Sequence, residues 1–211
     1  MKKAPSTASP FFTALGLGLA ALLAPAAQAG TVYDESAAGD LSGSGAAPTS
    51  VTLAAGANLV LGTTGRQNGV VDRDYLSFTV PVGWQLSAIT PLAGTGTVAG
   101  GLAFIGIEAG SQVNTPVTGP ASTLLGWHHY APGDVGNNIL PLIGAGAGAI
   151  GFSGALGAGN YAVWIQETGT GTVPYLMEFT LSAVPEPASA GLMLAGVLAL
   201  TASAARRRSR R

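Results

Sequence analysis

The chain has 211 residues, of which 9% are charged, and its nine Lys and Arg against ten Asp and Glu give a formal net charge of −1. Such low charge excludes a coiled coil, a charged disordered segment and a nucleic-acid binder with a basic surface. The 32 glycines lack the three-residue period of collagen, and the absence of cysteine excludes disulfides and thiolate chemistry.

The first 29 residues have the layout of a secretory signal peptide. Two lysines give a positive start, residues 11–23 form an uncharged apolar run, and Ala27 and Ala29 form a small-x-small cleavage site. The apolar run is too short to span a bilayer comfortably. We therefore predict that signal peptidase cleaves after Ala29 and leaves residues 30–183 as the exported domain. The alternative is a retained N-terminal anchor.

The exported domain is predicted to be all-β. Residues 75–80, 161–166 and 175–182 alternate apolar and polar side chains with the period of two that half-buried strands show. Residues 102–107 are apolar on both faces, as in a central strand. Weaker strand candidates are residues 50–53, 58–61, 85–90, 139–143 and 149–152. No convincing helical period occurs in this domain.

Turn-forming sequences such as Asn68-Gly69 and Pro132-Gly133-Asp134 separate the candidate strands. Many short strands joined by glycine-rich turns predict an antiparallel β-sandwich or jelly roll. Residues 36–49 are small and polar and are expected to form a loose lead-in. The Gly-Ala repeat at residues 144–149 fits either a flexible loop or a tightly packed strand.

Two stretches of this domain resemble bacterial pre-peptidase C-terminal domains. Residues 72–83 read Asp-Arg-Asp-Tyr-Leu-Ser-Phe-Thr-Val-Pro-Val-Gly, and residues 159–165 read Gly-Asn-Tyr-Ala-Val-Trp-Ile. The resemblance implies a small β-sandwich of the kind that accompanies secreted enzymes and surface proteins. In that family such domains serve as adhesion, carbohydrate-contact or solubilising modules.

The only two histidines of the chain lie in Trp127-His128-His129-Tyr130. Neighbouring residues on a strand face opposite sides, so one metal ion cannot easily take both histidines, although Asp134 is a conceivable further ligand. This spacing favours a polar-aromatic surface loop over a metal site. If the segment binds a ligand, the rings of Trp127 and Tyr130 are expected to stack against sugar rings.

Asp72 and Asp74 are candidate Ca²⁺ ligands. Two carboxylates two residues apart on a strand share a face, with Arg73 pointing away. A Ca²⁺ site needs more oxygen ligands than this stretch offers. We therefore favour the interpretation in which both aspartates cap the turn after Asn68-Gly69 and accept hydrogen bonds from nearby backbone amides. No metal or other cofactor is predicted.

No catalytic constellation is evident in the sequence. There is no Gly-x-Ser-x-Gly elbow, the histidines have no evident serine partner, and no glycine run joins a strand to a helix as phosphate loops do. Paired carboxylates of a glycosidase cannot be recognised from sequence, because their separation is spatial. A secreted polysaccharide hydrolase is therefore the alternative to the non-enzymatic protein that we predict.

Residues 184–211 consist of Val184-Pro185-Glu186-Pro187, an uncharged apolar stretch at residues 188–205, and an arginine cluster. The apolar stretch is long enough for a short transmembrane helix, and the positive-inside rule keeps the arginines cytoplasmic as a stop-transfer signal. The arginines are Arg206, Arg207, Arg208, Arg210 and Arg211. The alternative is a single-span membrane anchor that is never processed.

This order of parts resembles the PEP-CTERM sorting signal of Gram-negative bacteria. The resemblance implies transient insertion into the inner membrane and recognition of Pro185-Glu186-Pro187 by an exosortase, a membrane-embedded transpeptidase-like enzyme. It further implies delivery to the cell surface or extracellular matrix, often alongside exopolysaccharide and biofilm. Glu186 is the only charge between Glu178 and Arg206. We expect its carboxylate to bind in a basic pocket of the exosortase.

The charge of the chain is unevenly distributed. Residues 30–183 hold two arginines against nine acids, a net charge of −7, and the other basic residues all lie in the two terminal segments. The mature domain is therefore acidic and poorly suited to binding nucleic acid or other polyanions without a bridging cation. The sequence predicts an exported, non-enzymatic β-sandwich surface protein associated with exopolysaccharide or biofilm.

Overall fold

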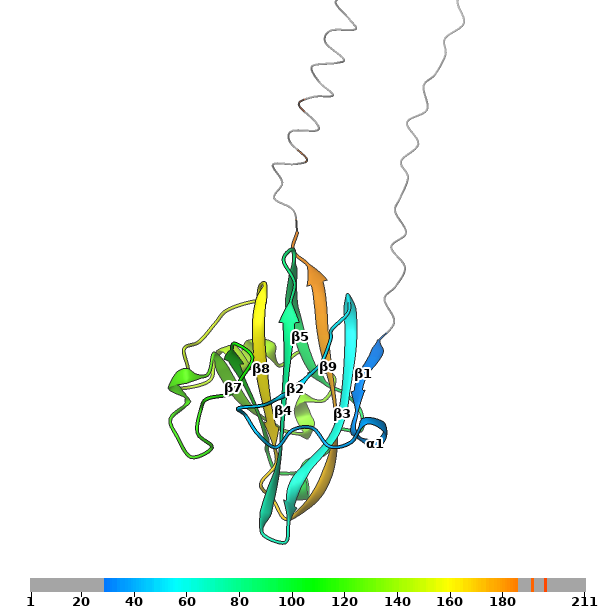
Figure 1. Cartoon of the computed structure of the whole chain (residues 1–211), viewed down its shortest axis with the longest axis vertical. Coiled ribbons are helices and arrows are strands. Elements are labelled where there is room, and N and C mark those ends of the chain that lie inside the picture. The colour runs from blue at the N-terminus through cyan, green and yellow to red at the C-terminus, as the bar shows by residue number, and fades with distance from the viewer. Residues whose placement is uncertain (1–28, 186–190, 192–195, 197–211) are drawn as a thin grey trace, which may run out of the picture.

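The computed structural model describes residues 29–185, together with Gly191 and Gly196 (Figure 1). Most of the predicted signal peptide, including Ala27, lies outside these residues. So do Glu186 and Pro187 of the sorting motif, the arginine cluster, and nearly all of the predicted transmembrane helix. Within the described ranges, no helix has the length and apolarity needed to cross a membrane.

The described domain is built almost entirely of strands. The strands are β1 (Gly30–Asp34), β2 (Thr49–Ser50), β3 (Gly56–Gln67), β4 (Val70–Val80), β5 (Trp84–Pro91), β6 (Ala103–Ala109), β7 (Gly126–Tyr130), β8 (Gly159–Gln166) and β9 (Gly171–Ala183). Two short α-helices, α1 (Glu35–Ala38) and α2 (Leu140–Gly144), interrupt them. Three 3₁₀ turns, η1 (Val98–Gly100), η2 (Ala121–Thr123) and η3 (Pro132–Asp134), complete the elements.

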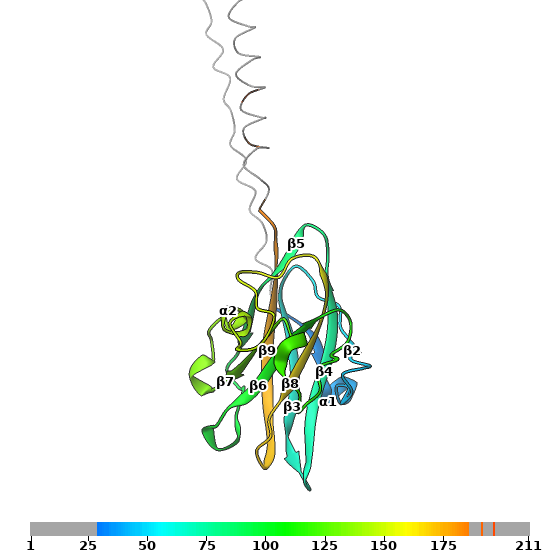
Figure 2. The ribbon, with the colours of Figure 1, turned by 90° about the vertical axis from the view of Figure 1, so that its left-hand side faces the viewer.

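These strands form one curled, mainly antiparallel sheet in the order β5-β9-β3-β4-β8-β6-β7, while β1 and β2 pair in parallel with β3 and β4. The curl arises because β3 and β4 pair only between residues 65–67 and 70–72. Beyond that point β3 follows β9 and β4 follows β8. We call β1, β3, β9 and β5 the β9 arm, and β2, β4, β8, β6 and β7 the β8 arm (Figures 1 and 2).

The tight turn between β3 and β4 joins the two arms. Asn68 and Gly69 both have positive φ, at 51° and 82°. A two-residue hairpin of type I′ requires this backbone, and Asn-Gly is the sequence that adopts it most readily. The predicted turn is confirmed, and it sets the point from which the arms diverge.

The arms face each other across a shared apolar core. Leu76, Phe78 and Val80 alternate into it from β4, with 4% or less of each residue exposed. Phe78 meets Phe179 of β9 edge to face, with ring centroids 5.7 Å apart. The period of two in the sequence thus identified the buried face of β4 correctly.

The four strongest strand candidates are all strands, and the predicted all-β class is confirmed in its coarse form. Residues 75–80, 102–107, 161–166 and 175–182 fall in β4, β6, β8 and β9, with Leu102 alone just outside. The weaker candidates 58–61 and 85–90 lie in β3 and β5, whereas only Ser50 of residues 50–53 is in a strand.

Two strand predictions were wrong. Residues 139–143 form most of helix α2, because Leu140 and Ile143 are buried one helical turn apart and Pro141 occupies a first-turn position that needs no N–H donor. Residues 149–152 are irregular, since Gly148 and Gly151 have positive φ and break the extended chain.

The segment at residues 36–49 is more ordered than predicted. It contains most of α1 and the start of β2, Ser42 bridges to Tyr75 of β4, and Leu41 is only 2% exposed. The Gly-Ala repeat is a packed turn rather than a strand. A Cβ added at Gly146 would lie 2.5 Å from the carbonyl oxygen of Trp127.

Both ends of the domain lie at the same end of the fold. Gly30 pairs with Asn58, which in turn pairs with Phe179 near the end of β9. Ala29 is exposed, and Val184 is 45% exposed while its N–H donates to the carbonyl of Gly83. The first residues of the predicted sorting motif leave the sheet at the tip of β5 and β9, several residues beyond the level at which β1 begins (Figure 1).

Candidate functional site

Three carboxylates from distant parts of the sequence meet between the arms. Glu35 opens α1, Asp40 lies in the loop after it, and Asp74 is on β4. One oxygen from each lies within 4.8 Å of the other two. We call Glu35, Asp40 and Asp74 the acidic cluster.

Local sequence places Glu35 beside Asp40. Asp34 caps α1 by accepting a hydrogen bond from the Ser36 N–H at 2.9 Å, which starts the helix at Glu35. Gly39, with φ of 91°, ends the helix after one turn. The chain therefore reverses at once and brings Asp40 back to the helix start.

Glu35 ties this N-terminal segment to the sheet. Its Oε1 accepts from the Leu41 N–H at 3.1 Å, and its Oε2 accepts from the Thr63 N–H of β3 at 2.8 Å. Burial raises the pKa of Glu35, and these two backbone hydrogen bonds lower it in part. Glu35 is thus held in a fixed orientation toward the cluster.

Asp74 is the exceptional member. It is fully buried, and neither carboxylate oxygen has a hydrogen-bond partner among the described residues. Burial, followed by the charge of Glu35, raises the pKa of Asp74 to about 9. The nearby Tyr175 hydroxyl lowers this pKa only in part and lies outside hydrogen-bond geometry. The predicted turn-capping role is therefore wrong for Asp74.

No basic side chain of the described residues neutralises the acidic cluster. The ion pair found among residues 29–185 joins His128 to Asp134 at 3.5 Å. Arg73 donates to the Gln166 side chain at 2.9 Å, and Arg66 donates to the Thr168 carbonyl at 3.0 Å. A buried carboxylate without a partner is rare in folded proteins, and it indicates a missing proton or cation.

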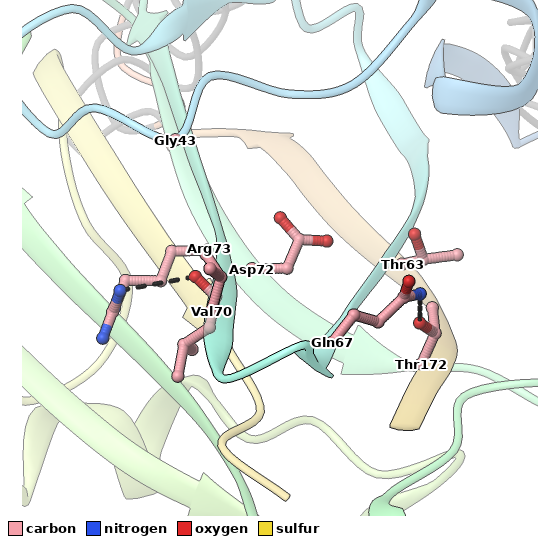
Figure 3. A pocket seen from close by; sticks show the side chains of 8 residues that line it. Gly43, Thr63, Gln67, Val70, Asp72, Arg73 and Thr172 are labelled. Carbon is pink, nitrogen blue, oxygen red and sulfur yellow. Dashed lines mark hydrogen bonds between the residues drawn. The ribbon is translucent and has the colours of Figure 1, made fainter. Parts of the chain in front are cut away.

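A hollow of about 520 Å³ is lined by Thr63 and Asp72 but by none of the three cluster residues, and Figure 3 shows it from close by. Asp72 and Arg73 both line the hollow, and their side chains project in opposite directions, as the period of two predicted. Thr63 lines the hollow and also holds Glu35, which connects the two features. Burial, followed by the charge of Asp40, raises the pKa of Asp72. Of the two predicted Ca²⁺ ligands, Asp74 belongs to the cluster and Asp72 flanks it.

Sequence reasoning missed Glu35 and Asp40 as members of this site. Both lie in or beside the segment expected to be a loose lead-in. The signal that identifies them is the parallel pairing of β1 with β3, which places residue 35 beside Thr63, 28 residues away in sequence. Such pairing leaves no local pattern in the sequence.

The aromatic-histidine segment is strand β7 rather than the surface loop that we favoured. Trp127 and His129 lie on its outer side, where both pack against Phe104, whereas Tyr130 is 1% exposed in the core. The prediction that Tyr130 stacks on a ligand is therefore wrong. His128 faces Asp134, and the alternation of the strand separates it from His129 as expected.

Comparison with known proteins adds no relative. No protein-family model matches the chain, and neither a curated protein nor a solved structure matches it.

Proposed function

We propose that the chain is an exported, non-enzymatic surface protein whose mature domain, residues 30–183, is a β-sandwich that binds Ca²⁺ at the acidic cluster. The observation that carries the cation site is the buried carboxylate of Asp74, which has no partner of its own and faces Glu35 and Asp40. The two arms that face each other across one core support the sandwich architecture.

The chemistry of the cluster selects the kind of cation. Ca²⁺ takes six to eight oxygen ligands, and three carboxylates supply several while water completes the shell. Zn²⁺ prefers nitrogen and sulfur ligands. The chain has no cysteine, and both histidines lie on β7, outside the cluster.

Binding of the cation would hold the mature N-terminal segment to the sheet reversibly. Without it, Asp74 is expected to hold a proton at neutral pH, because its pKa is about 9. With it, the carboxylates of Asp74, Glu35 and Asp40 would share one divalent ion, which fastens the mature N-terminal segment to the sheet. Extracellular Ca²⁺ modules work at dissociation constants of about 10⁻⁴–10⁻³ M, which suits a protein outside the cell.

The proposed location depends on the two terminal segments. The signal-peptide layout supports export, and the resemblance of residues 184–211 to PEP-CTERM signals supports exosortase sorting to the surface or matrix of a Gram-negative bacterium. Exopolysaccharide is the proposed neighbour there. The exposed Val184 beyond β9 leaves the chain accessible to a processing enzyme.

Thermal unfolding of the mature exported protein tests the cation site. We expect millimolar Ca²⁺ to raise Tm by several degrees and a chelator to reverse the rise. Asp74→Asn should abolish the response. Glu178→Gln, an acid on β9 outside the cluster, serves as the matched control and should respond like the wild type. A wild-type Tm that ignores Ca²⁺ contradicts the proposal.

Mass spectrometry of the mature C-terminus tests the sorting route. We expect a chain that ends near Pro185–Pro187 in the wild type and an unprocessed chain after Glu186→Ala. An intact transmembrane tail in the wild type identifies the unprocessed membrane anchor instead. Turnover of a polysaccharide by the purified protein identifies the hydrolase alternative and overturns the non-enzymatic role.

A further inference from the structure

A second hollow lies on the outer side of the β8 arm, away from the core. It has a volume of about 280 Å³ and is lined by Phe104 of β6, Trp127 and His129 of β7, Trp164 and Gln166 of β8, and the loop from Thr115 to Leu124. We call it the aromatic hollow. Figure 2 views the domain from the side of these three strands.

The register of three strands creates the hollow. Gly106 at the centre of β6 pairs with Trp127 on one side and with Trp164 on the other. A Cβ at this position would lie 3.0 Å from the Phe104 ring and 3.3 Å from Leu124. Glycine therefore leaves room between two tryptophans for the Phe104 ring. The partly exposed rings of Phe104 and Trp127 form the aromatic surface of the hollow, and Trp164, only 3% exposed, packs against Phe104.

The aromatic surface is fixed before any ligand arrives. The rings of Phe104 and Trp127 are stacked at 6.1 Å and 21°, and those of Phe104 and Trp164 are 4.7 Å apart. The indole N–H of Trp127 donates to the Ala147 carbonyl at 3.0 Å, which locks the ring. A ring held in this way loses little conformational entropy when a ligand stacks on it.

The polar groups of the hollow are uncharged. Among residues 29–185, no Asp, Glu, Lys or Arg side chain lines it. Burial, followed by the charge of His128, lowers the pKa of His129, so this imidazole is neutral at pH 7. The side-chain oxygen of Gln166 accepts from Arg73 at 2.9 Å, which directs its amide N–H₂ away from that contact as a free donor.

We propose that the aromatic hollow binds one neutral sugar ring of a polysaccharide. The apolar face of a pyranose stacks on Trp127, and its hydroxyls bond to the Gln166 amide and the His129 imidazole. The small volume, just below the roughly 300 Å³ at which the range for ligand pockets begins, fits a single ring. The inference rests on the proposed exopolysaccharide role and names the ligand class, but it uses none of the residues of the acidic cluster.

Affinity electrophoresis of the full mature protein tests this, with dextran, galactan and mannan as neutral probes and alginate as an anionic one. We expect at least one neutral probe to retard the wild type. Trp127→Ala should reduce that affinity at least tenfold. Val117→Trp, which adds an indole to the exposed loop that lines the hollow, should do the same. Leu102→Ala, at an exposed apolar residue outside the hollow, is the matched control and should bind like the wild type.

The outcomes separate this site from the cation site. Retardation by a neutral probe that persists in a chelator and in Asp74→Asn supports the aromatic hollow, even if Ca²⁺ has no effect on Tm. No retardation by any neutral probe overturns it, and so does retardation that both Trp127→Ala and Val117→Trp leave unchanged. Retardation by alginate alone, lost in Asp74→Asn, overturns the hollow while keeping the proposed cation function.

Discussion

Two buried carboxylates on the β8 arm are held in opposite ways. Glu108 of β6 is 5% exposed and accepts four hydrogen bonds, from the backbone and side chains of Asn114 and Thr115, at 2.9–3.2 Å. Asp74 of β4 is fully buried and accepts none from the described part of the chain. Glu108 therefore stabilises a loop by itself, whereas Asp74 needs a proton or a cation. Burial alone does not mark an acid as part of a binding site. A buried carboxylate that accepts no hydrogen bond does.

The largest effect is expected at Glu108. In Glu108→Ala, the N–H groups of residues 114 and 115 lose their acceptor inside the fold, which should lower the free energy of unfolding by about 3 kcal/mol. Urea denaturation measures the change. The loss should be the same with and without Ca²⁺. A Ca²⁺-dependent loss would mean that the two carboxylates are not as different as the structure indicates.

Asp74→Asn should act in the opposite direction. In a chelator at pH 8 the substitution removes a carboxylate that is costly to ionise inside the fold, so we expect the free energy of unfolding to rise by about 1–2 kcal/mol. In millimolar Ca²⁺ the wild type should be the more stable of the two. Urea denaturation in both buffers measures these differences. A variant that is less stable than the wild type in both buffers contradicts the assignment of Asp74 to the cation site.

The pH dependence of the calcium-free protein sharpens the comparison. Asp74 has a pKa of about 9 when folded and about 3.9 when unfolded, so between these values the folded state binds more protons. Stability is then greatest at low pH and is lost as pH rises. We expect at least about 1.4 kcal/mol less stability at pH 8 than at pH 5, equivalent to one pKa unit. The raised pKa values of Glu35 and Asp72 add to this trend.

Chemical denaturation at pH 5 and pH 8 measures this difference. Asp74→Asn should remove most of it, and saturating Ca²⁺ should reduce it in the wild type. Stability that increases from pH 5 to pH 8 in a chelator would show that Asp74 is ionised in the folded protein without a bound cation.

Gly62→Ala is expected to have a smaller effect. A Cβ there would lie 2.5 Å from the Tyr175 hydroxyl and 2.9 Å from Cδ of Glu35, so both must move. We expect a loss of about 1 kcal/mol of stability and a several-fold weaker response to Ca²⁺. Gly133→Ala, where a Cβ meets nothing within 4 Å, is the control. Equal Ca²⁺ responses in the two variants would mean that Glu35 is not part of the cation site.

The contrast between the two carboxylates also shows how far sequence reasoning reaches. The alternation of residues 75–80 gave the buried face of β4, and its phase places Asp74 on the same face as Leu76. No local pattern shows which donors surround a buried acid. Asn114 and Thr115 lie close to Glu108 in sequence, whereas Glu35 reaches Asp74 only through strand pairing.

The other misses have similar physical causes. Residues 139–143 are too few to distinguish the period of 2 of a strand from the period of 3.6 of a helix. They form a helix because Leu140 and Ile143 are both buried in that conformation. The aromatic hollow depends on the register of β6 between β7 and β8, which placed Gly106 between two tryptophans. Of the four residues that the sequence singles out at 127–130, Trp127 and His129 line the hollow, whereas His128 and Tyr130 do not. Phe104 and Trp164 cannot be recognised from sequence, because they join Trp127 only in the sheet.

Titration calorimetry with Ca²⁺ at pH 7, in buffers of different ionisation enthalpy, measures whether the acidic cluster binds the cation. We predict one Ca²⁺ per wild-type chain, with about one proton released as the ion displaces it from Asp74, and no binding to Asp74→Asn. Absence of binding to the wild type, or equal affinity and no difference in proton release between the two proteins, would contradict the proposed cation site.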